Sequence, residues 1–434
     1  MRETNNPDVA LAWEWLDELE SWVEENGLEG YDPLLIEAYP FIRTLINIPF
    51  IGRCISHSQR VFPPLFRKMF ILTPVETAEA HALMAIAYLR LYQIDGNTKY
   101  LEKSEYHLTW LRSKRISTGD GWSWGYPFPY SIDGVKIPPN TPISEVTGLV
   151  GNAYAFAYEL TGVESYLNVV LEVAKFFVEV LPSYSFENGS KCFAYALKDG
   201  TYFSYSANVL VGEFLHNVFR LTNDKYYKEI SVPAVEFILR NQNEDGSWYS
   251  GFHKTNSDFS TSQVVIGYQL GVILRALYSI YKVSPSDEIK QALLKGFHLY
   301  AKQFFSEMGQ PLFSPQNQYP VDIRACAEGI LCPSYLYEII QSAHVLAVFV
   351  LRWSWFYMRD RNTGDLYYRR HRFTTSKITF PRWGVAWVFR ALAEYLYHFH
   401  SVKERVERLK LQSIRWLPDP KFFPFAKPMD NQQE

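Results

Sequence analysis

The chain has 434 residues, a formal net charge of −3, an apolar content of 47% and an aromatic content of 17%. This composition is sufficient for a large core, and the small charge without an extended basic stripe argues against nucleic acid as a partner. No stretch has the composition of a linker, so we expect one domain over residues 1–434. The 30 tyrosines and 12 tryptophans favour a groove that stacks flat ligands, with ordinary helix packing as the alternative.

The first residues, Met1–Asn6, lack the apolar core of a signal peptide, which predicts a cytoplasmic location. The cysteines follow no zinc-site spacing and no disulfide framework, and neither a phosphate loop nor a His-Glu-x-x-His motif is present. We therefore predict no metal and no cofactor. The apolar run within Tyr335–Phe356 is interrupted by charged residues and too short to span a membrane, so it predicts a buried helix.

Apolar periodicity predicts helices along most of the chain. In chain order they are expected at about residues 8–26, 33–47, 75–94, 97–114, 145–160, 164–181, 207–221, 224–240, 263–282, 286–306, 322–331, 335–357 and 382–401. Residues 1–74 fall outside the recognisable repeat, and residues 402–434 are expected to form a C-terminal extension.

Three helix-to-helix turns are of one kind. They are built on Gly96, Gly162 and Asn223, residues that can end a helix in a left-handed conformation, and each is followed by a tyrosine near the start of the next helix. Repetition of one helix–turn–helix unit indicates a repeat architecture. We expect an all-α fold, a single (α/α)6-type toroid of helix pairs with short β-hairpins on one rim.

The expected hairpins interrupt the helices. Cys192–Tyr205 alternates aromatic and small residues around Lys198–Gly200, and Met358–Phe373 does so around Asn362–Asp365. Gly119–Thr141 is a long loop rich in glycine, proline and aromatic residues, a length that is typical of functional loops in compact folds.

Candidate catalytic carboxylates lie on these interruptions. Asp120 stands among aromatic residues that would raise its pKa for use as a general acid, although it could be a turn residue bonded to its own backbone. Asp322 follows a proline at the start of a helix, where it is either an N-cap or an inward-facing carboxylate. A glycoside hydrolase needs two carboxyl groups about 5–10 Å apart. The expected sugar platforms beside this pair are Trp122, Trp124 and Tyr126.

A second candidate region is positive and aromatic. Tyr367, Tyr368 and Arg369 lie near Lys377, Arg382 and Trp383, a combination suited to holding a carboxylated sugar and to lowering the pKa of a tyrosine such as Tyr368. The alternative is a solvated hairpin face. Further candidate substrate contacts are Asn208, Asp245, Trp248, Tyr268 and Tyr319, of which Asp245 fits a helix-capping turn better.

Several motifs together carry a resemblance to a known family. They are Trp124–Phe128 with Thr141-Pro142, Gln242–Gly251, Tyr319–Ile323, Tyr367–Arg369 and Arg382–Trp387. In order and spacing this set resembles the VpsJ-like proteins of polysaccharide-biosynthesis gene clusters, over about residues 75–400. The resemblance implies an α/α toroid that works on an oligosaccharide or polysaccharide, with a glycosyltransferase or export complex as a possible partner.

The element Gln242–Trp248 is also similar to the repeat motif of squalene and terpene cyclases. This chain lacks the Asp-rich motif with which those enzymes protonate their substrate, so cyclisation is the lowest-ranked alternative. The chain also departs from the polysaccharide family. Ser262–Ile266 replaces a segment that usually carries Asp and His, Arg324 stands where His is common, and Asn208 is the only asparagine kept of an Asn-x-Asn pair.

These observations leave three classes of function. The first is a carbohydrate-active enzyme that cleaves a glycosidic bond in a central aromatic cleft. The second is a lyase or C5-epimerase of uronic acids, in which a tyrosine removes a proton and an arginine neutralises the carboxylate. The third is a noncatalytic glycan-binding scaffold, which the departures at residues 262–266 and 324 favour.

Overall fold

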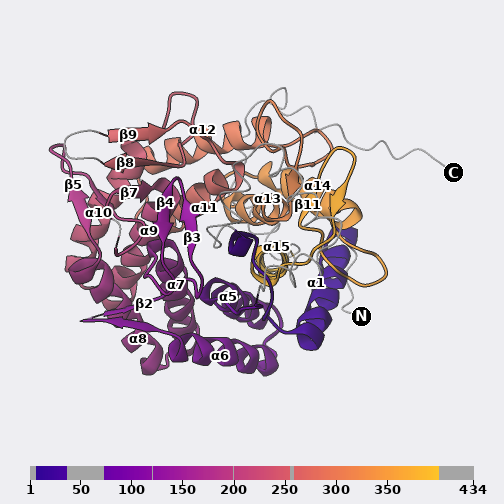
Figure 1. The fold of residues 1–434 in the computed structure, drawn as a ribbon, viewed down its shortest axis with the longest axis horizontal. Coiled ribbons are helices and arrows are strands. Elements are labelled where there is room, and N and C mark those ends of the chain that lie inside the picture. The colour runs from indigo at the N-terminus through magenta and orange to yellow at the C-terminus, as the bar shows by residue number, and fades with distance from the viewer. Residues whose placement is uncertain (1–5, 37–72, 120, 199, 255–258, 400–434) are drawn as a thin grey trace, which may run out of the picture.

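The computed structural model describes residues 6–36, 73–119, 121–198, 200–254 and 259–399. Within these ranges, six helices line the inside of a ring (Figure 1), each contacting the next, and the last contacts the first. They are α5 (Ala78–Asp95), α7 (Ser144–Thr161), α9 (Tyr205–Thr222), α11 (Gly267–Val283), α13 (Ile323–Leu336) and α15 (Trp387–Phe399). The ring is therefore closed by the contact between α15 and α5.

A second set of helices covers the outside of the ring. Five of them follow an inner helix in the sequence and pack against it: α6 (Thr98–Ser113), α8 (Glu164–Lys175), α10 (Lys225–Arg240), α12 (Asp287–Gln303) and α14 (Ala343–Tyr357). The N-terminal helix α1 (Pro7–Asn26) packs against α15 and α14. It thus takes the outer position beside the last inner helix, although its sequence lies outside the recognisable repeat.

Short irregular helices extend this scaffold. A 3-10 turn, η1, covers Pro33–Ile36, a π-helical segment η2 (Phe176–Val180) continues α8, and a second one, η3 (Pro381–Ala386), leads into α15. The predicted left-handed turns are confirmed, with φ of 72° at Gly96, 69° at Gly162 and 58° at Asn223. Each of these residues donates its backbone N–H to a carbonyl of the helix it ends, which satisfies a carbonyl that the helix leaves unpaired.

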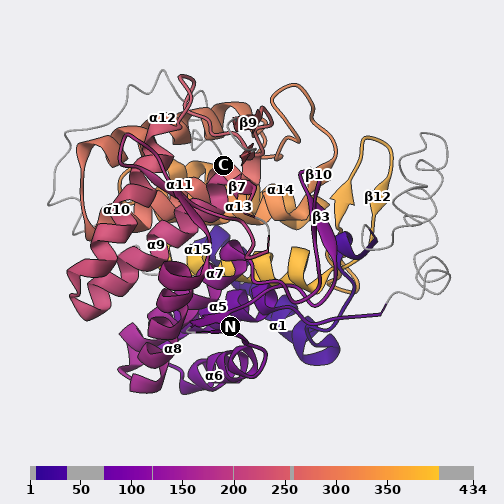
Figure 2. The same ribbon diagram turned by 60° about the vertical axis from the view of Figure 1, so that its left-hand side comes forward.

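Twelve short strands form small antiparallel sheets in the described residues. They are β1 (Ile116–Thr118), β2 (Gly121–Ser123), β3 (Tyr130–Ile132), β4 (Val135–Ile137), β5 (Ser183–Ser185), β6 (Lys191–Phe193), β7 (Tyr202–Ser204), β8 (Gly251–Lys254), β9 (Phe259–Ser262), β10 (Val321–Asp322), β11 (Arg369–Arg370) and β12 (Thr375–Ser376). Strands β7 and β10 run directly into α9 and α13. They therefore lie at the N-terminal ends of inner helices, and Figure 2 shows β3, β10 and β12 together on one side of the ring.

The strand pairing corrects one predicted hairpin. Strand β6 pairs with β5, and β7 pairs with β8, which follows about 50 residues later. The segment Cys192–Tyr205 is therefore split between two sheets. In the second predicted hairpin a single bridge joins Arg359 to Leu366, and β11 pairs with both β10 and β12. This three-stranded sheet places Asp322 opposite Arg369.

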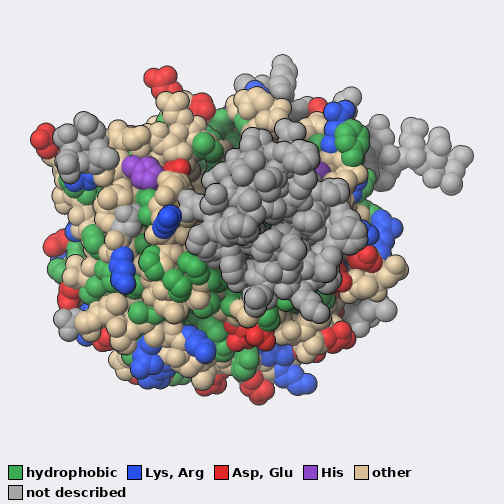
Figure 3. Space-filling model, in the orientation of Figure 1, with side chains coloured by type: hydrophobic (Ala, Val, Ile, Leu, Met, Phe, Trp, Pro, Cys, Tyr) green, Lys and Arg blue, Asp and Glu red, His purple; other side chains and the backbone are tan. Residues whose placement is uncertain are grey.

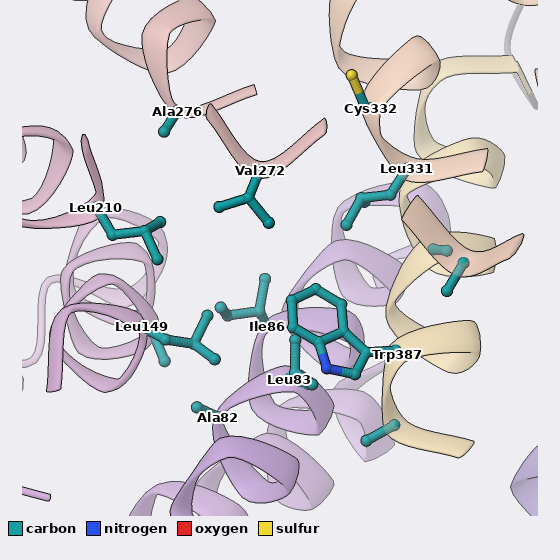
Figure 4. Packing of buried hydrophobic residues seen from close by; sticks show 14 of the residues in the cluster. Ala82, Leu83, Ile86, Leu149, Leu210, Val272, Ala276, Leu331, Cys332 and Trp387 are labelled. Carbon is teal, nitrogen blue, oxygen red and sulfur yellow. The ribbon is translucent and has the colours of Figure 1, made fainter. Parts of the chain in front are cut away.

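Apolar side chains from all six inner helices meet on the axis of the ring. We call this group the apolar belt, and Figure 4 shows how its members point toward one another: Leu83, Ile86, Leu149, Leu210, Val272, Leu331 and Trp387. Each is at most 8% exposed. Burial of one such side chain contributes about 1.5–3 kcal/mol. The belt separates the two ends of the ring, so each end has polar chemistry of its own.

Some sequence predictions fall outside the described residues. These are Asp120, the greater part of the helix expected at 33–47, and the C-terminal extension 402–434. No helix in the described ranges combines the length and the apolar character that crossing a membrane would require.

Candidate active site

A buried glutamate stands at the start of α5. Thr77 caps this helix, and Glu79 lies in its first turn, where the helix dipole favours an acidic side chain. Its Oε1 accepts a hydrogen bond from Trp387 Nε1 at 2.8 Å, and its Oε2 accepts from the Tyr126 hydroxyl at 2.5 Å and from Arg382 Nη1 at 2.6 Å. Burial alone would raise the pKa of Glu79, but the Arg382 and Arg324 guanidiniums and the hydrogen bond from Tyr126 together outweigh it, and the pKa is lowered to about 2.

The partner of Glu79, Arg382, is itself enclosed by acceptors. Its Nε and Nη2 donate to the two carboxylate oxygens of Asp32, the second at 2.8 Å, and the side chain is 3% exposed. Arg382 lies in η3, so these bonds link the segment that leads into α15 to the segment after α1 and to α5. All of its charge-assisted donors face protein carboxylates or Tyr126, so Arg382 holds the site together and has no free donor pair for a substrate carboxylate.

A second glutamate has the opposite electrostatic environment. Glu145 lies in the first turn of α7, is partly exposed, and makes an ion contact of 3.6 Å from its Oε1 to Arg324 Nη2. Burial raises its pKa, and the cationic Arg324 offsets only part of that effect. Glu79 and Glu145 both line a cavity of about 10 Å³, together with Arg275 and Trp387. That volume holds about one water molecule.

Arg324 connects this carboxylate to an aromatic cage. It lies in the first turn of α13, is 6% exposed, and its guanidinium carbon is 4.6 Å, 4.9 Å and 4.7 Å from the ring centroids of Tyr268, Trp383 and Trp387. Cation–π contacts of this kind stabilise a desolvated guanidinium. Its Nε is buried without a hydrogen-bond partner in the described part of the chain. A buried donor without a partner costs about 1–3 kcal/mol, so the fold keeps this group at an energetic cost.

Asp322 lies beside the cage as the N-cap of α13. Its Oδ1 accepts from the Arg324 backbone N–H at 2.9 Å and from Trp383 Nε1 at 2.8 Å, and its Oδ2 accepts from Arg369 Nε at 2.7 Å. Of the two readings that the sequence left open, the structure shows the cap. Asp322 positions Arg324, Trp383 and Arg369 around the site.

The environment of Tyr368 contradicts the expectation that its pKa is lowered. Its ring packs edge-on against Phe380, with centroids 4.9 Å apart, and its pKa is raised, because burial and then the nearby Asp322 carboxylate both oppose ionisation. The sequence predicted a lowered pKa from the neighbouring arginines. Arg369 acts in that direction but is paired with Asp322, so its effect is outweighed.

Three more predicted contacts support the fold instead of facing a ligand. The indoles of Trp124 and Trp248, 1% and 2% exposed, donate to the backbone carbonyls of Leu111 and Ile238. The fully buried Asn208 exchanges two hydrogen bonds with the backbone of Phe193. No surface of these side chains is left for a sugar, which corrects the prediction that they bind one.

The other candidates lie on loops and strands away from the buried carboxylates' hydrogen-bond network. Asp245 accepts from the N–H and hydroxyl of Ser247, the turn geometry that its sequence favoured. The ring of Trp122 lies under the Arg115 guanidinium, at 4.5 Å. Tyr367 donates to Asp360 at 3.2 Å with the exposed Lys377 over its ring, and Tyr319, half-buried, precedes β10.

The structure thus brings together Tyr126, Tyr268, Asp322, Tyr368, Arg369, Arg382 and Trp383 from the predicted set, and adds Asp32, Glu79, Glu145 and Trp387. Glu79 and Glu145 share one feature that the sequence shows, because each stands in the first turn of an apolar helix. Among the described residues, no three His, Cys, Asp or Glu side chains gather as metal ligands do. Figure 3 shows acidic and basic side chains interspersed along the lower edge of this face.

Comparison with solved structures identifies the fold class. No protein-family model and no curated protein matches the sequence. A cellobiose 2-epimerase from Bacillus thermoamylovorans aligns with a TM-score of 0.61 and 12% identity, over 89% of this chain and 99% of that one. A D-mannose isomerase aligns with a TM-score of 0.56 and 13% identity, over 74% and 87%.

The GH76A α-1,6-mannanase from Salegentibacter aligns with a TM-score of 0.57 and 10% identity, over 90% of this chain and 99% of that one. These likenesses confirm the predicted α/α toroid fold. At such identities the fold alone is shared. Membership of the VpsJ-like family stays a prediction.

Proposed function

We propose that this chain is a carbohydrate-active enzyme of the (α/α)6 type that cleaves a glycosidic bond, with Glu145 as its proton donor. The observation that carries the proposal is the contrast between two carboxylates that line one cavity. The pKa of Glu79 is lowered to about 2, whereas the pKa of Glu145 is raised. Environments that push two carboxyl pKa values apart mark acid and base roles in enzymes that act on glycosides.

The roles follow from the hydrogen bonds. Glu79 stays ionised and is fixed by Tyr126, Trp387 and Arg382, so it supplies negative charge next to the reacting sugar or orients a water. Burial raises the pKa of Glu145 and so favours its protonated form, which can transfer a proton to a glycosidic oxygen. The rings of Tyr268 and Trp383 hold the Arg324 guanidinium beside Glu145.

The structural neighbours support a glycan as the substrate class, since they include sugar epimerases and family 76 mannanases. A variant of the Salegentibacter mannanase with two consecutive aspartates replaced by asparagine is inactive and was captured with α-1,6-mannotriose. This chain has no two consecutive aspartates. Its carboxylates would therefore come from other positions of the fold, which the pair Glu79 and Glu145 provides.

A second candidate is epimerisation or elimination on a uronic acid. Arg324 favours it, because a buried guanidinium with a spare N–H is the group that would neutralise a substrate carboxylate. Arg382, which the sequence suggested for that role, is occupied by Asp32 and Glu79. The polysaccharide-biosynthesis setting and a glycosyltransferase or export partner are part of the proposal through the family resemblance alone, and the cytoplasmic location is part of it as an expectation from the sequence.

Product analysis separates these reactions. The protein would be incubated with mannotriose, cellobiose and oligogalacturonate, and the products followed by mass spectrometry, by absorbance of unsaturated sugars and by proton NMR, which detects a change of stereochemistry. Shortened products that disappear in Glu145→Gln support glycosidic cleavage. Unsaturated products, or products of unchanged mass and altered stereochemistry, point to the second candidate, and binding without turnover points to the scaffold.

A further inference from the structure

Three aromatic side chains are exposed where the β11–β12 hairpin meets the end of α14. Phe356 and Tyr357 are the last residues of α14 and are 52% and 44% exposed, and Phe373, 88% exposed, lies in the turn that joins the two strands. Strand β11 lies beside the end of α14 (Figure 1), because the Arg370 guanidinium lies over the Tyr357 ring. Exposed aromatic side chains that are grouped in this way mark a binding surface more often than isolated ones do.

An arginine lies over each of these three rings. The distances from guanidinium carbon to ring centroid are 5.4 Å for Arg361 over Phe356, 5.0 Å for Arg370 over Tyr357 and 5.2 Å for Arg372 over Phe373. We call these six residues the arginine–aromatic patch. An exposed cation–π contact contributes about 0.5–1 kcal/mol and uses none of the guanidinium N–H donors. The contacts therefore restrict the arginines in position and leave their donors available.

The three arginines of the patch have no carboxylate partner within the described part of the chain. The acidic residues nearest in the sequence have other partners. Asp360 accepts from the Tyr367 hydroxyl, and Asp365 accepts from Trp22 Nε1 at 2.9 Å. The positive charge of the patch is therefore uncompensated, although the chain as a whole carries a formal charge of −3. An anionic partner would supply the missing acceptors.

The patch lies next to the candidate active site but outside it. In strand β11, Arg369 is opposite Asp322 and is paired with that carboxylate at 2.7 Å. Successive side chains of a strand point to opposite faces of its sheet, so Arg370 points away from the site, toward Tyr357. A ligand that contacts both the site and the patch must therefore extend past the β11–β12 hairpin, as a chain of sugars can.

We propose that the arginine–aromatic patch binds an acidic polysaccharide, a polymer of sugars with repeated carboxylate or sulfate groups. Guanidinium forks bind such groups through two parallel hydrogen bonds, and exposed rings offer apolar faces to sugar rings. An anionic membrane surface would also attract the arginines. The hairpin turn, however, has polar residues on both sides of Phe373, so only one ring could enter a membrane there. The inference rests on the proposed function in taking the polymer as the enzyme's substrate.

Binding of the full chain to polymers tests the inference. Affinity electrophoresis would use polygalacturonate, dextran sulfate and neutral dextran at one ionic strength, and sedimentation would use vesicles of phosphatidylcholine and phosphatidylglycerol. All proteins would carry Glu145→Gln, so that no polymer is cleaved during the measurement. Two variants alter the patch, Arg370→Gln/Arg372→Gln and Phe373→Ser. The control Lys225→Gln/Lys302→Gln removes the same charge from exposed positions on α10 and α12. Thermal melts establish that each variant is folded.

We expect at least one acidic polymer to bind the parent protein and the lysine control alike, with dextran at least about tenfold weaker. The arginine variant should weaken binding about tenfold or more, and Phe373→Ser several-fold. Which polymer binds identifies the anionic group. Absence of polymer binding, equal binding of dextran, an equal loss in the lysine control, or binding to vesicles alone overturns the inference.

Failure of the inference and failure of the proposed function are distinguishable. Polymer binding that depends on the patch, in a protein whose Glu145 form cleaves no glycan, overturns the proposed function and leaves the patch as a polysaccharide-binding surface. Cleavage of a glycan by a protein whose patch variants bind acidic polymers as the parent does overturns the inference alone.

Discussion

The two ends of the ring differ in how completely their buried charged side chains are paired. At the C-terminal end, Glu394 is shared by Arg90 and Arg390, and Arg220 is paired with Glu159 through two hydrogen bonds. At the N-terminal end, Arg382 and Glu79 are paired as completely, but Arg324 keeps a donor without a partner. Burial raises the pKa of one carboxyl group at each end, Glu145 at the N-terminal end and Glu213 at the other, so the unpaired guanidinium is the difference between them. Unrelieved electrostatic cost of this kind is concentrated where proteins carry out chemistry.

We expect the largest loss of stability from removing Arg382, the cation that Asp32 and Glu79 share. Arg382→Met leaves the carboxylates of Asp32 and Glu79 buried without their cation, and it should lower the free energy of unfolding by about 3–5 kcal/mol. Urea unfolding followed by circular dichroism measures it. Arg240→Met removes one partner of an exposed pair with Glu236 and should cost at most about 1 kcal/mol. Equal effects of the two substitutions would contradict the assigned role of Arg382.

The pH dependence of stability sharpens the same comparison. The folded pKa of Glu79, about 2, lies below its ordinary value of 4.5, so its contribution is fully present above pH 4.5 and is lost as the pH falls toward 2. The contribution is about 3 kcal/mol. The stability difference between wild type and Glu79→Gln, measured by urea unfolding at pH 7, 4 and 3, should therefore shrink as the pH falls. A difference that is constant with pH would show that Glu79 is not ionised in the fold.

Substitution of Arg324, the unpaired guanidinium at the N-terminal end, should affect activity more than stability. Arg324→Met removes a cation that has one unpaired donor and one ion contact, of 3.6 Å, to the partly exposed Glu145, so we expect the free energy of unfolding to fall by less than it does in Arg382→Met. Activity should nevertheless fall. Because Arg324 lowers the pKa of Glu145, its loss should move the limb of the pH–rate profile that reports Glu145 to higher pH. A large loss of stability with an unmoved profile would mean that Arg324 is structural.

Much of the ring was predictable because its determinants are local. Apolar periodicity and the left-handed turns at Gly96, Gly162 and Asn223 gave the helix pairs, and the turn at Asp245 followed from its neighbours. The split of Cys192–Tyr205 between two sheets was not predictable, since β7 pairs with a strand about 50 residues away.

The site was predicted only in part, for the same reason. Tyr268, Asp322, Arg382 and Trp383 were recognised as candidates, but Glu79 and Glu145 look like ordinary first-turn acids in the sequence. What distinguishes them from Glu164, the exposed first-turn acid of α8, is the side of the ring that they face. Which side a residue faces is decided when the ring closes, through contacts between segments as far apart as Asp32 and Arg382. Trp124 and Trp248 were mistaken for substrate contacts because the composition of their loops does not show that both indoles are buried.

The proposed reaction depends on proton transfer from Glu145. The most direct measurement compares turnover by Glu145→Gln with that of the wild type and of Glu164→Gln, its counterpart on an outer helix, on the glycan that the product screen identifies. If Glu145 is the proton donor, kcat falls at least about a hundredfold in Glu145→Gln alone, with its melting temperature maintained. Turnover of Glu145→Gln within a few-fold of the wild type would contradict it.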